Sequence, residues 1–277
     1  MNRPLFFGLH AVPGRALSIA LVAAPFLITI LVYWIASEIR LAENPNDKLL
    51  PSFGQMADAF WRMAAEPNKR TGELLLWADT LASLQRLAVG VLGGSAIGLF
   101  LGLNIALFPA LRRMFGAYIT VLSIIPPLAL LPVLFISFGV GEEAKIILIF
   151  IGTVFVITRD MVLAVQQIPN EQITKALTLG ASQLAVVYRV VLPQVFPRLI
   201  NTTRLTLGAA WLFLIAAEMI AATEGLGYRI GLVRRYLAMD LIIPYVMWIT
   251  FLGFMIDGAL RLWVARGFSW YDPEKGS

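Results

Sequence analysis

Six apolar runs, each long enough to cross a lipid bilayer, are the feature that most constrains this chain. They cover about residues 16–36, 80–107, 117–138, 145–165, 199–222 and 241–264. A hydrocarbon core of about 30 Å is crossed by about 20 residues of α-helix. In lipid the backbone polar groups must pair inside the segment, which a helix does. We therefore predict an all-α integral membrane protein with about six transmembrane helices, forming a single transmembrane domain over residues 1–277.

The composition excludes several classes of soluble and catalytic protein. Hydrophobic residues make up 59% of the 277 residues and charged residues only 14%, against about a quarter charged in soluble domains. There is no cysteine, so disulfides and thiol chemistry are excluded. The single histidine, His10, has no neighbouring ligand residues, so we expect no metal site. The net charge of +5 fits contact with membrane lipid headgroups, and no nucleic-acid signature is present.

Two features suggest how the helices are arranged. Glycines recur every fourth residue at Gly90, Gly94, Gly98 and Gly102, a row that lets a second helix approach closely in lipid. Prolines interrupt the third run at Pro126-Pro127 and again shortly after. Broken helices often line a cavity, so we interpret this break as part of a solute pathway, with simple packing as the alternative.

The residues between the first and second apolar runs, 37–75, are polar. Pro51-Ser52 is expected to open an amphipathic helix in this segment, lying along the membrane surface. No Walker-type loop is complete, because Leu99 and Phe100 stand where Lys and Ser or Thr would follow Gly93 and Gly98. Any ATP must therefore be hydrolysed by a partner.

Ionisable residues inside the apolar runs are candidates for function. Glu218 is the main one: it either anchors the helix bundle or contacts solute along the pathway. Asp257 is expected to be structural, and Arg159-Asp160 to form an ion pair within its helix. After the fifth run come Arg229, Arg234 and Arg235, which form either a solvated rim or a docking site for an acidic partner surface.

A polar segment at residues 168–198 has the pattern of two short helices joined by a turn. Asn170 is expected to cap the first helix and Gly180 to end it. Ser182 is expected to cap the second helix, which Pro193 closes. The apolar positions give the segment one hydrophobic face, formed by Ile173, Leu177, Leu184, Val187 and Val190. Such a hairpin is suited to another protein's groove, although a partly buried connecting loop would show the same periodicity.

The spacing from Ala176 through Gly180 to Val190 and Leu192-Pro193 resembles the cytoplasmic EAA loop of ABC importer permeases. Thr174 and Lys175 depart from the usual Glu-Ala at its start. The resemblance implies a coupling helix that docks on a separate ATPase subunit. It assigns ATPase coupling to Lys175, Ala176, Leu177, Gly180, Ala181, Val190, Leu192 and Pro193.

Three further stretches are similar to the nitrate/sulfonate/taurine/bicarbonate branch of these permeases: Thr80 to Arg86, Ile125 to Lys145 and Trp211 to Tyr228. The resemblance implies a type I importer with two copies of this chain, a pair of ATPase subunits that use ATP and Mg, and a periplasmic or lipid-anchored substrate-binding protein. Candidate pathway residues are Pro126, Pro127, Trp211, Glu218 and Thr223, and candidate docking residues for the binding protein are Arg229, Arg234 and Arg235.

The resemblance also implies a bacterial inner membrane location with both termini and the hairpin in the cytoplasm and residues 37–75 in the periplasm. Charge alone leaves the orientation open, because Arg229, Arg234 and Arg235 would then fall outside. LAENPNDKLLPS and LVRRYLAMD resemble a sub-branch associated with urea or guanidine use, so those solutes are an alternative. A secondary transporter working without ATP is the alternative class, and an enzyme is not expected.

Overall fold

The computed structural model describes residues 14–45, 47–68 and 72–271, and every regular element in these ranges is helical. The predicted all-α class is confirmed; His10 and the end of the C-terminal tail lie outside the described residues. In chain order the elements are α1 (Arg15–Glu43), α2 (Phe53–Ala65), α3 (Leu75–Leu107), α4 (Pro109–Leu122), the 3-10 turn η1 (Pro127–Leu130), α5 (Leu131–Phe138), α6 (Glu142–Gln166), α7 (Asn170–Thr178), α8 (Gln183–Val186), the π-turn η2 (Val187–Val191), α9 (Leu192–Ala221), α10 (Leu226–Arg234) and α11 (Met239–Gly267).

The chain divides into two units. The first contains Met1–Arg62 and Val233–Pro244, and the second contains Met63–Leu232 and Tyr245–Ser277. In the first unit the loop after α1 is bound back to that helix, because the Tyr33 hydroxyl donates to the Pro51 carbonyl at 2.7 Å. Ser52 and Gln55 exchange hydrogen bonds at the start of α2, a capping box that explains why the expected amphipathic helix begins here.

The second unit is built on the close packing of α3 against α6. Each glycine of the row on α3 lies against α6: Gly90 faces Ile149, Gly94 faces Thr153, Gly98 faces Ile157 and Gly102 faces Met161. A Cβ added at these four glycines would lie 2.1–2.8 Å from an α6 side chain, too close for any other residue. The paired positions advance together, so the two helices run parallel. The prediction of a close helix contact at this row is confirmed.

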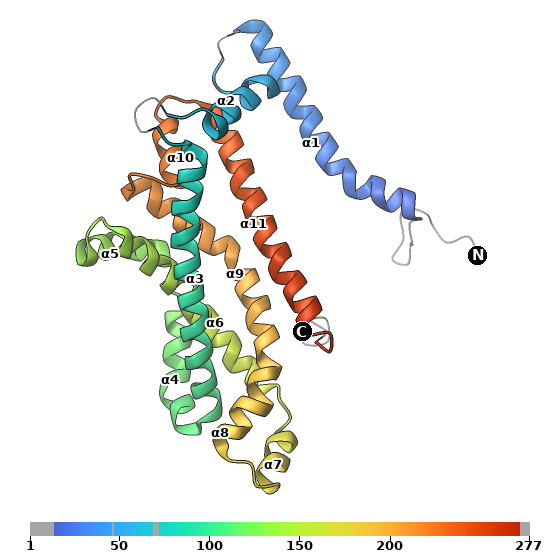
Figure 1. The fold of residues 1–277 in the computed structure, drawn as a ribbon, viewed down its shortest axis with the longest axis vertical. Helices are drawn as coiled ribbons and strands as arrows, with labels where there is room; N and C mark the ends of the chain where they lie inside the picture. Colours follow the sequence, from blue (N-terminus) through green and yellow to red (C-terminus); the bar gives the residue numbers. More distant parts are fainter. Residues whose placement is uncertain (1–13, 46, 69–71, 272–277) are drawn as a thin grey trace. The chain divides into compact units, whose positions relative to one another are not determined.

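Helix α9 completes the core of this unit. Gly152 of α6 accommodates the Phe213 ring, with a would-be Cβ only 2.2 Å from it. The hydroxyls of Ser95 and Thr203 lie 3.0 Å apart between α3 and α9. In Figure 1 the short helices α7 and α8 lie at one end of this bundle and α10 at the other. These ends are called the hairpin end and the far end below.

The third apolar run forms a broken pair of helices rather than one straight span. Helix α4 begins at Pro109, so the segment we expected to be a connection before residue 117 is helical. Proline suits this first position because its missing N–H has no partner there anyway. The helices on either side of residues 123–126 are bent by 83°. Among the described residues five helices are long and apolar enough to cross a membrane, or six if this bent pair is one span.

We predict that Gly94→Leu lowers the free energy of unfolding by about 1–3 kcal/mol or prevents folding, because the new side chain would overpack the α3–α6 contact. The melting temperature of the detergent-solubilised protein measures this effect. Gly116→Leu on α4 is the matched control, since a Cβ at Gly116 meets nothing within 4 Å. Equal destabilisation by both substitutions would contradict the packing we describe.

Candidate functional site

The segment between α6 and α9 folds as the predicted helical hairpin. Helix α7 ends in a Schellman motif around Gly180, which has a φ of +86°. The Ala181 N–H donates to the Ala176 carbonyl at 3.1 Å, and the Gly180 N–H donates to that of Leu177 at 3.0 Å. The Ser182 hydroxyl then accepts from the Ala185 N–H at 3.2 Å and starts α8. Asn170 is the first residue of α7 and not its cap, which corrects that prediction; Pro169 holds the N-cap position and makes no side-chain capping hydrogen bond.

Pro193 does not close the second helix, and this prediction was wrong. The π-turn η2 lies just before it, and the Leu192 N–H donates to the carbonyl of Val187, five residues back. Pro193 therefore falls in the first turn of α9, directly after the π-turn. Residues Gln183 to Ala221 run on as one helical stretch. The hairpin is consequently continuous with a transmembrane helix instead of being separated from it.

The hairpin has an inner face that packs on the bundle. Ile173, Ala176, Ala181 and Val190 pack against a cluster of buried residues that includes members of α6, η2 and α9. Of the predicted coupling residues, Ala176, Ala181, Val190 and Leu192 are thus half-buried, whereas Lys175, Leu177, Gly180 and Pro193 are exposed. The first group shapes the hairpin, and the second is available to a partner.

The outer face of the hairpin carries large apolar side chains that are exposed to solvent. Leu179 is 79% exposed, and Leu184, Tyr188 and Leu177 are also exposed. Lys175 and Arg189 are exposed beside them. Leu179 and Tyr188 were missed by the sequence analysis, because a helical periodicity carried through the turn does not locate a residue on the turn itself. A rigid apolar tip with cationic neighbours is suited to an apolar groove with an acidic rim.

Polar contacts fix the hairpin to the helices that flank it. The Arg198 guanidinium on α9 binds Asp160 on α6 with N–O distances of 2.8 and 3.1 Å, and it donates to Gln167 at 2.9 Å. Asp160 therefore pairs across helices with Arg198 and not with its neighbour Arg159, which corrects that prediction. The reason is geometric: adjacent residues on a helix do not face each other.

Glu218 lies at the far end of the bundle in a dense polar cluster. Its carboxylate is fully buried and accepts from Arg86 at 2.7 Å, from the Ser83 hydroxyl at 2.8 Å and from the Gly227 N–H at 2.8 Å. Gly225, with a φ of +117°, lies over the ion pair, and a Cβ there would come within 2.6 Å of Glu218. The carboxylate is thus satisfied and enclosed. This arrangement favours the anchoring role among the two that the sequence left open.

Arg229 is also held within the protein. Its guanidinium binds the buried Asp79 carboxylate at 2.8 Å, and the Tyr245 hydroxyl bonds the same carboxylate at 3.3 Å. Burial is the largest single effect on the pKa of Arg229 and lowers it, but the hydrogen bond to Asp79 and the nearby negative charge together outweigh burial, so the pKa of Arg229 is raised. Arg234 and Arg235 are exposed. Of the three arginines proposed for docking, only these two present their side chains at the surface.

The other predicted pathway residues are not brought together. Pro126 is exposed at the bend of the third run and Thr223 is exposed after α9. Trp211 lies in the middle of α9, is 7% exposed, and has the one buried side-chain N–H without a hydrogen-bond partner among the described residues. It packs beside Gly253 of α11. In this conformation these residues do not form a solute site.

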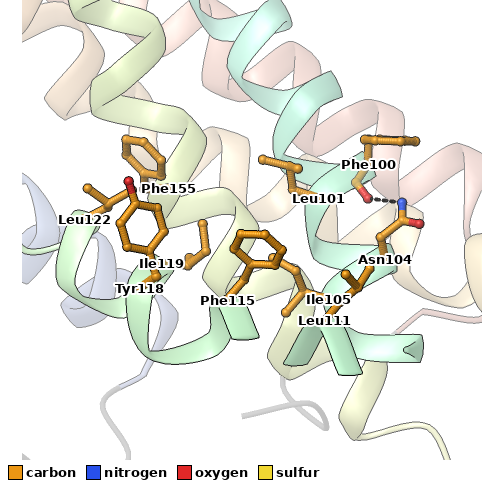
Figure 2. A pocket seen from close by; sticks show the side chains of 10 residues that line it. All are labelled: Phe100, Leu101, Asn104, Ile105, Leu111, Phe115, Tyr118, Ile119, Leu122 and Phe155. Carbon is orange, nitrogen blue, oxygen red and sulfur yellow. Dashed lines mark hydrogen bonds between the residues drawn. The ribbon is translucent and has the colours of Figure 1, made fainter. Parts of the chain in front are cut away.

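A cavity of about 410 Å³ lies between α3, α4 and α6 (Figure 2). Its walls include Phe100, Phe115, Ile119 and Phe155, and its amide side chain, Asn104, donates to the Phe100 carbonyl at 2.7 Å. None of the predicted pathway residues lines it. Such an apolar lining lacks the convergent polar groups that a small polar solute needs.

Several transport permeases are similar to this chain in sequence. The taurine transport system permease protein TauC of Escherichia coli is 28% identical over 258 residues, covering 93% of this chain and 91% of its own. The putative aliphatic sulfonates permease SsuC of the same organism is 32% identical, covering 78% and 80%. The bicarbonate permease CmpB of Synechococcus elongatus is 31% identical, covering 69% and 70%.

Solved structures show the same fold. The inward-facing methionine ABC transporter MetNI matches with a TM-score of 0.60 at 22% identity, over 69% of this chain and 95% of that one. A bacterial ABC transporter involved in alginate import matches with a TM-score of 0.62 at 11% identity, over 91% and 96%. The family described as "Binding-protein-dependent transport system inner membrane component" matches residues 94–268. This chain therefore belongs to the inner membrane permeases of binding-protein-dependent ABC importers, in the branch that contains the taurine, nitrate, sulfonate and bicarbonate permeases.

Proposed function

We propose that the hairpin between α6 and α9 is the surface on which a separate ATPase subunit docks. The observation that carries this proposal is the exposed apolar tip formed by Leu177, Leu179, Leu184 and Tyr188 on an otherwise well-fixed hairpin. Such a patch is costly to leave in water and marks an interaction site. The ATPase subunits bind and hydrolyse ATP with Mg, and this chain contributes the membrane passage. A second copy of the chain and a substrate-binding protein complete the importer.

We infer the orientation in two steps, counting the bent pair as one crossing. With six crossings the two termini lie on one side, and the hairpin, which follows the fourth, lies on that same side. We place this side in the cytoplasm, where ATP is available. Residues 37–75 with helix α2 then lie in the periplasm, together with Arg234 and Arg235, which remain the candidate contacts for an acidic surface of the binding protein.

The transported solute is proposed to be a small oxyanion or sulfonate, as the names of the similar permeases indicate. Asp79, Glu218 and Asp257 each pair with an arginine, so none of these carboxylates is available to hold a guanidinium ion. The unpartnered N–H of Trp211 is a donor that solute oxygens could use when α9 moves. Pro126, Pro127 and Thr223 remain candidate contacts along the same passage.

Leu179→Asp should abolish ATPase docking, because it places a charge in the centre of the apolar tip. We expect at least a tenfold loss of co-purified ATPase subunit, the effect of about 1.4 kcal/mol in binding. Affinity capture from gently solubilised membranes measures it. Trp61→Asp on α2 is the control, since Trp61 is 67% exposed but far along the chain from the hairpin. Unchanged capture by Leu179→Asp would refute docking at this tip.

Glu218→Gln should act on stability and not on solute passage. Removing the charge leaves the buried Arg86 with less compensation, and we expect a loss of about 3 kcal/mol in the free energy of unfolding. Asp257→Asn is the comparison, since that carboxylate is partly exposed and pairs with Arg204. This substitution should lower the free energy of unfolding by less than Glu218→Gln does. Melting temperature and taurine uptake per folded complex are measured together. Normal stability with lost uptake would instead show that Glu218 contacts solute.

A further inference from the structure

Two ion-pair clusters hold the helices that flank the hairpin. At the hairpin end Asp160 of α6 binds Arg198 of α9. At the far end Arg86 of α3 binds Glu142, the first residue of α6, and Glu218, in the last turns of α9. Glu142 and Asp160 are 18 residues apart, about 27 Å along a helix. Ion pairs therefore connect α6 and α9 near both ends of the two helices. At the far end the connection is indirect, because both helices bind Arg86 of α3.

Arg86 is bound through its whole guanidinium. Its Nε and Nη2 bind the two carboxylate oxygens of Glu142 side by side. Its Nη1 binds the Glu218 carboxylate at 2.7 Å and the Glu224 carbonyl at 3.0 Å, and Nη2 also reaches the Glu224 carboxylate at 3.4 Å. These contacts use all five N–H groups of an arginine. A lysine could not replace this fork, because its ammonium cannot bind two carboxylates bidentately.

The partners of Arg86 differ in how firmly they are held. Glu218 is fully buried and has two further donors, Ser83 and Gly227. The side chains of Glu142 and Glu224 are 55% and 61% exposed. The inner bond thus joins α3 to α9 at a buried site, whereas the outer bonds join Arg86 to α6 and to the segment after α9 at a surface that water reaches.

We propose that Arg86 is a positioning residue for transport, one that makes the far ends of α6 and α9 move together when the hairpin is displaced. The proposal rests on the proposed docking of an ATPase at the hairpin. The glycine contact between α3 and α6 begins at Gly90, which faces Ile146 and Ile149. The first turn of α6, residues 142–145, lies before this contact, and the bidentate bond from Arg86 to Glu142 ties that turn to α3. Without that bond, displacement of the hairpin would bend α6 instead of carrying its outer end along.

The test uses the absence of cysteine from the chain. Glu143→Cys places a single reactive thiol at the exposed start of α6. Its labelling by a membrane-impermeant maleimide is measured in the assembled complex, without nucleotide and after trapping with ATP and vanadate. We expect the labelling rate to change about fivefold on trapping. In the Arg86→Gln and Glu142→Ala backgrounds we expect no change, and in Arg86→Lys only a partial one.

Glu142→Ala leaves the buried bond between Arg86 and Glu218 in place, so this variant provides the test if Arg86→Gln does not fold. Arg113→Gln, on the exposed start of α4, is the control, and with it the labelling rate should change as in the chain carrying Glu143→Cys alone. Melting temperatures show which variants are intact. An intact Glu142→Ala variant with the full change in labelling would overturn the proposal, as would a chain carrying Glu143→Cys alone whose labelling rate does not change on trapping. If no ATPase subunit co-purifies with the unmodified chain, the proposed function itself fails.

Discussion

The close contact between α3 and α6 is the constraint on which the rest of the second unit depends. Lipid surrounds a membrane helix with a medium as apolar as its own side chains, so hydrophobic burial gives helices little reason to associate. Glycine at every fourth position from Gly90 to Gly102 removes the side chains that would keep the backbones apart. Dispersion contacts between this face of α3 and α6 then provide the attraction that hydrophobic burial does not provide in lipid. Helix α9 packs on the result, and the hairpin is held between α6 and α9.

Buried ion pairs are the second interaction that holds the helices of this unit together. Arg86, Asp79, Glu218 and Arg229 lie within or beside apolar helices, where an unpaired charge would be very costly. Each is therefore paired and hydrogen-bonded, and the pairs join segments that are distant in sequence. Gly225 fits over the Glu218–Arg86 pair because it has neither a Cβ nor a barrier to positive φ. Buried ion pairs of this kind specify which segments meet, while the glycine row on α3 sets how closely α3 and α6 pack.

The sequence predicted the elements better than their connections. Apolar length, the glycine row, and the Gly180 and Ser182 signals are local, and the structure has them where they were expected. The errors at Pro193 and Asp160 concern hydrogen bonds that apolar periodicity does not indicate. A π-turn that accommodates a proline depends on hydrogen bonds five residues apart, and the partner of Asp160 lies 38 residues away. The network around Arg86 was likewise out of reach, because its four segments meet only after folding, although Arg86 and Glu218 both lie in recognisable motifs.

Cross-linking from the hairpin tip would test the central claim most directly. A photoreactive amino acid placed at Leu179 in native membranes would capture whatever covers this side chain. The account predicts one major adduct, to an ATP-binding subunit, formed in the assembled importer. Adducts to lipid alone, with solute uptake that continues without ATP, would contradict it and would favour a secondary transporter.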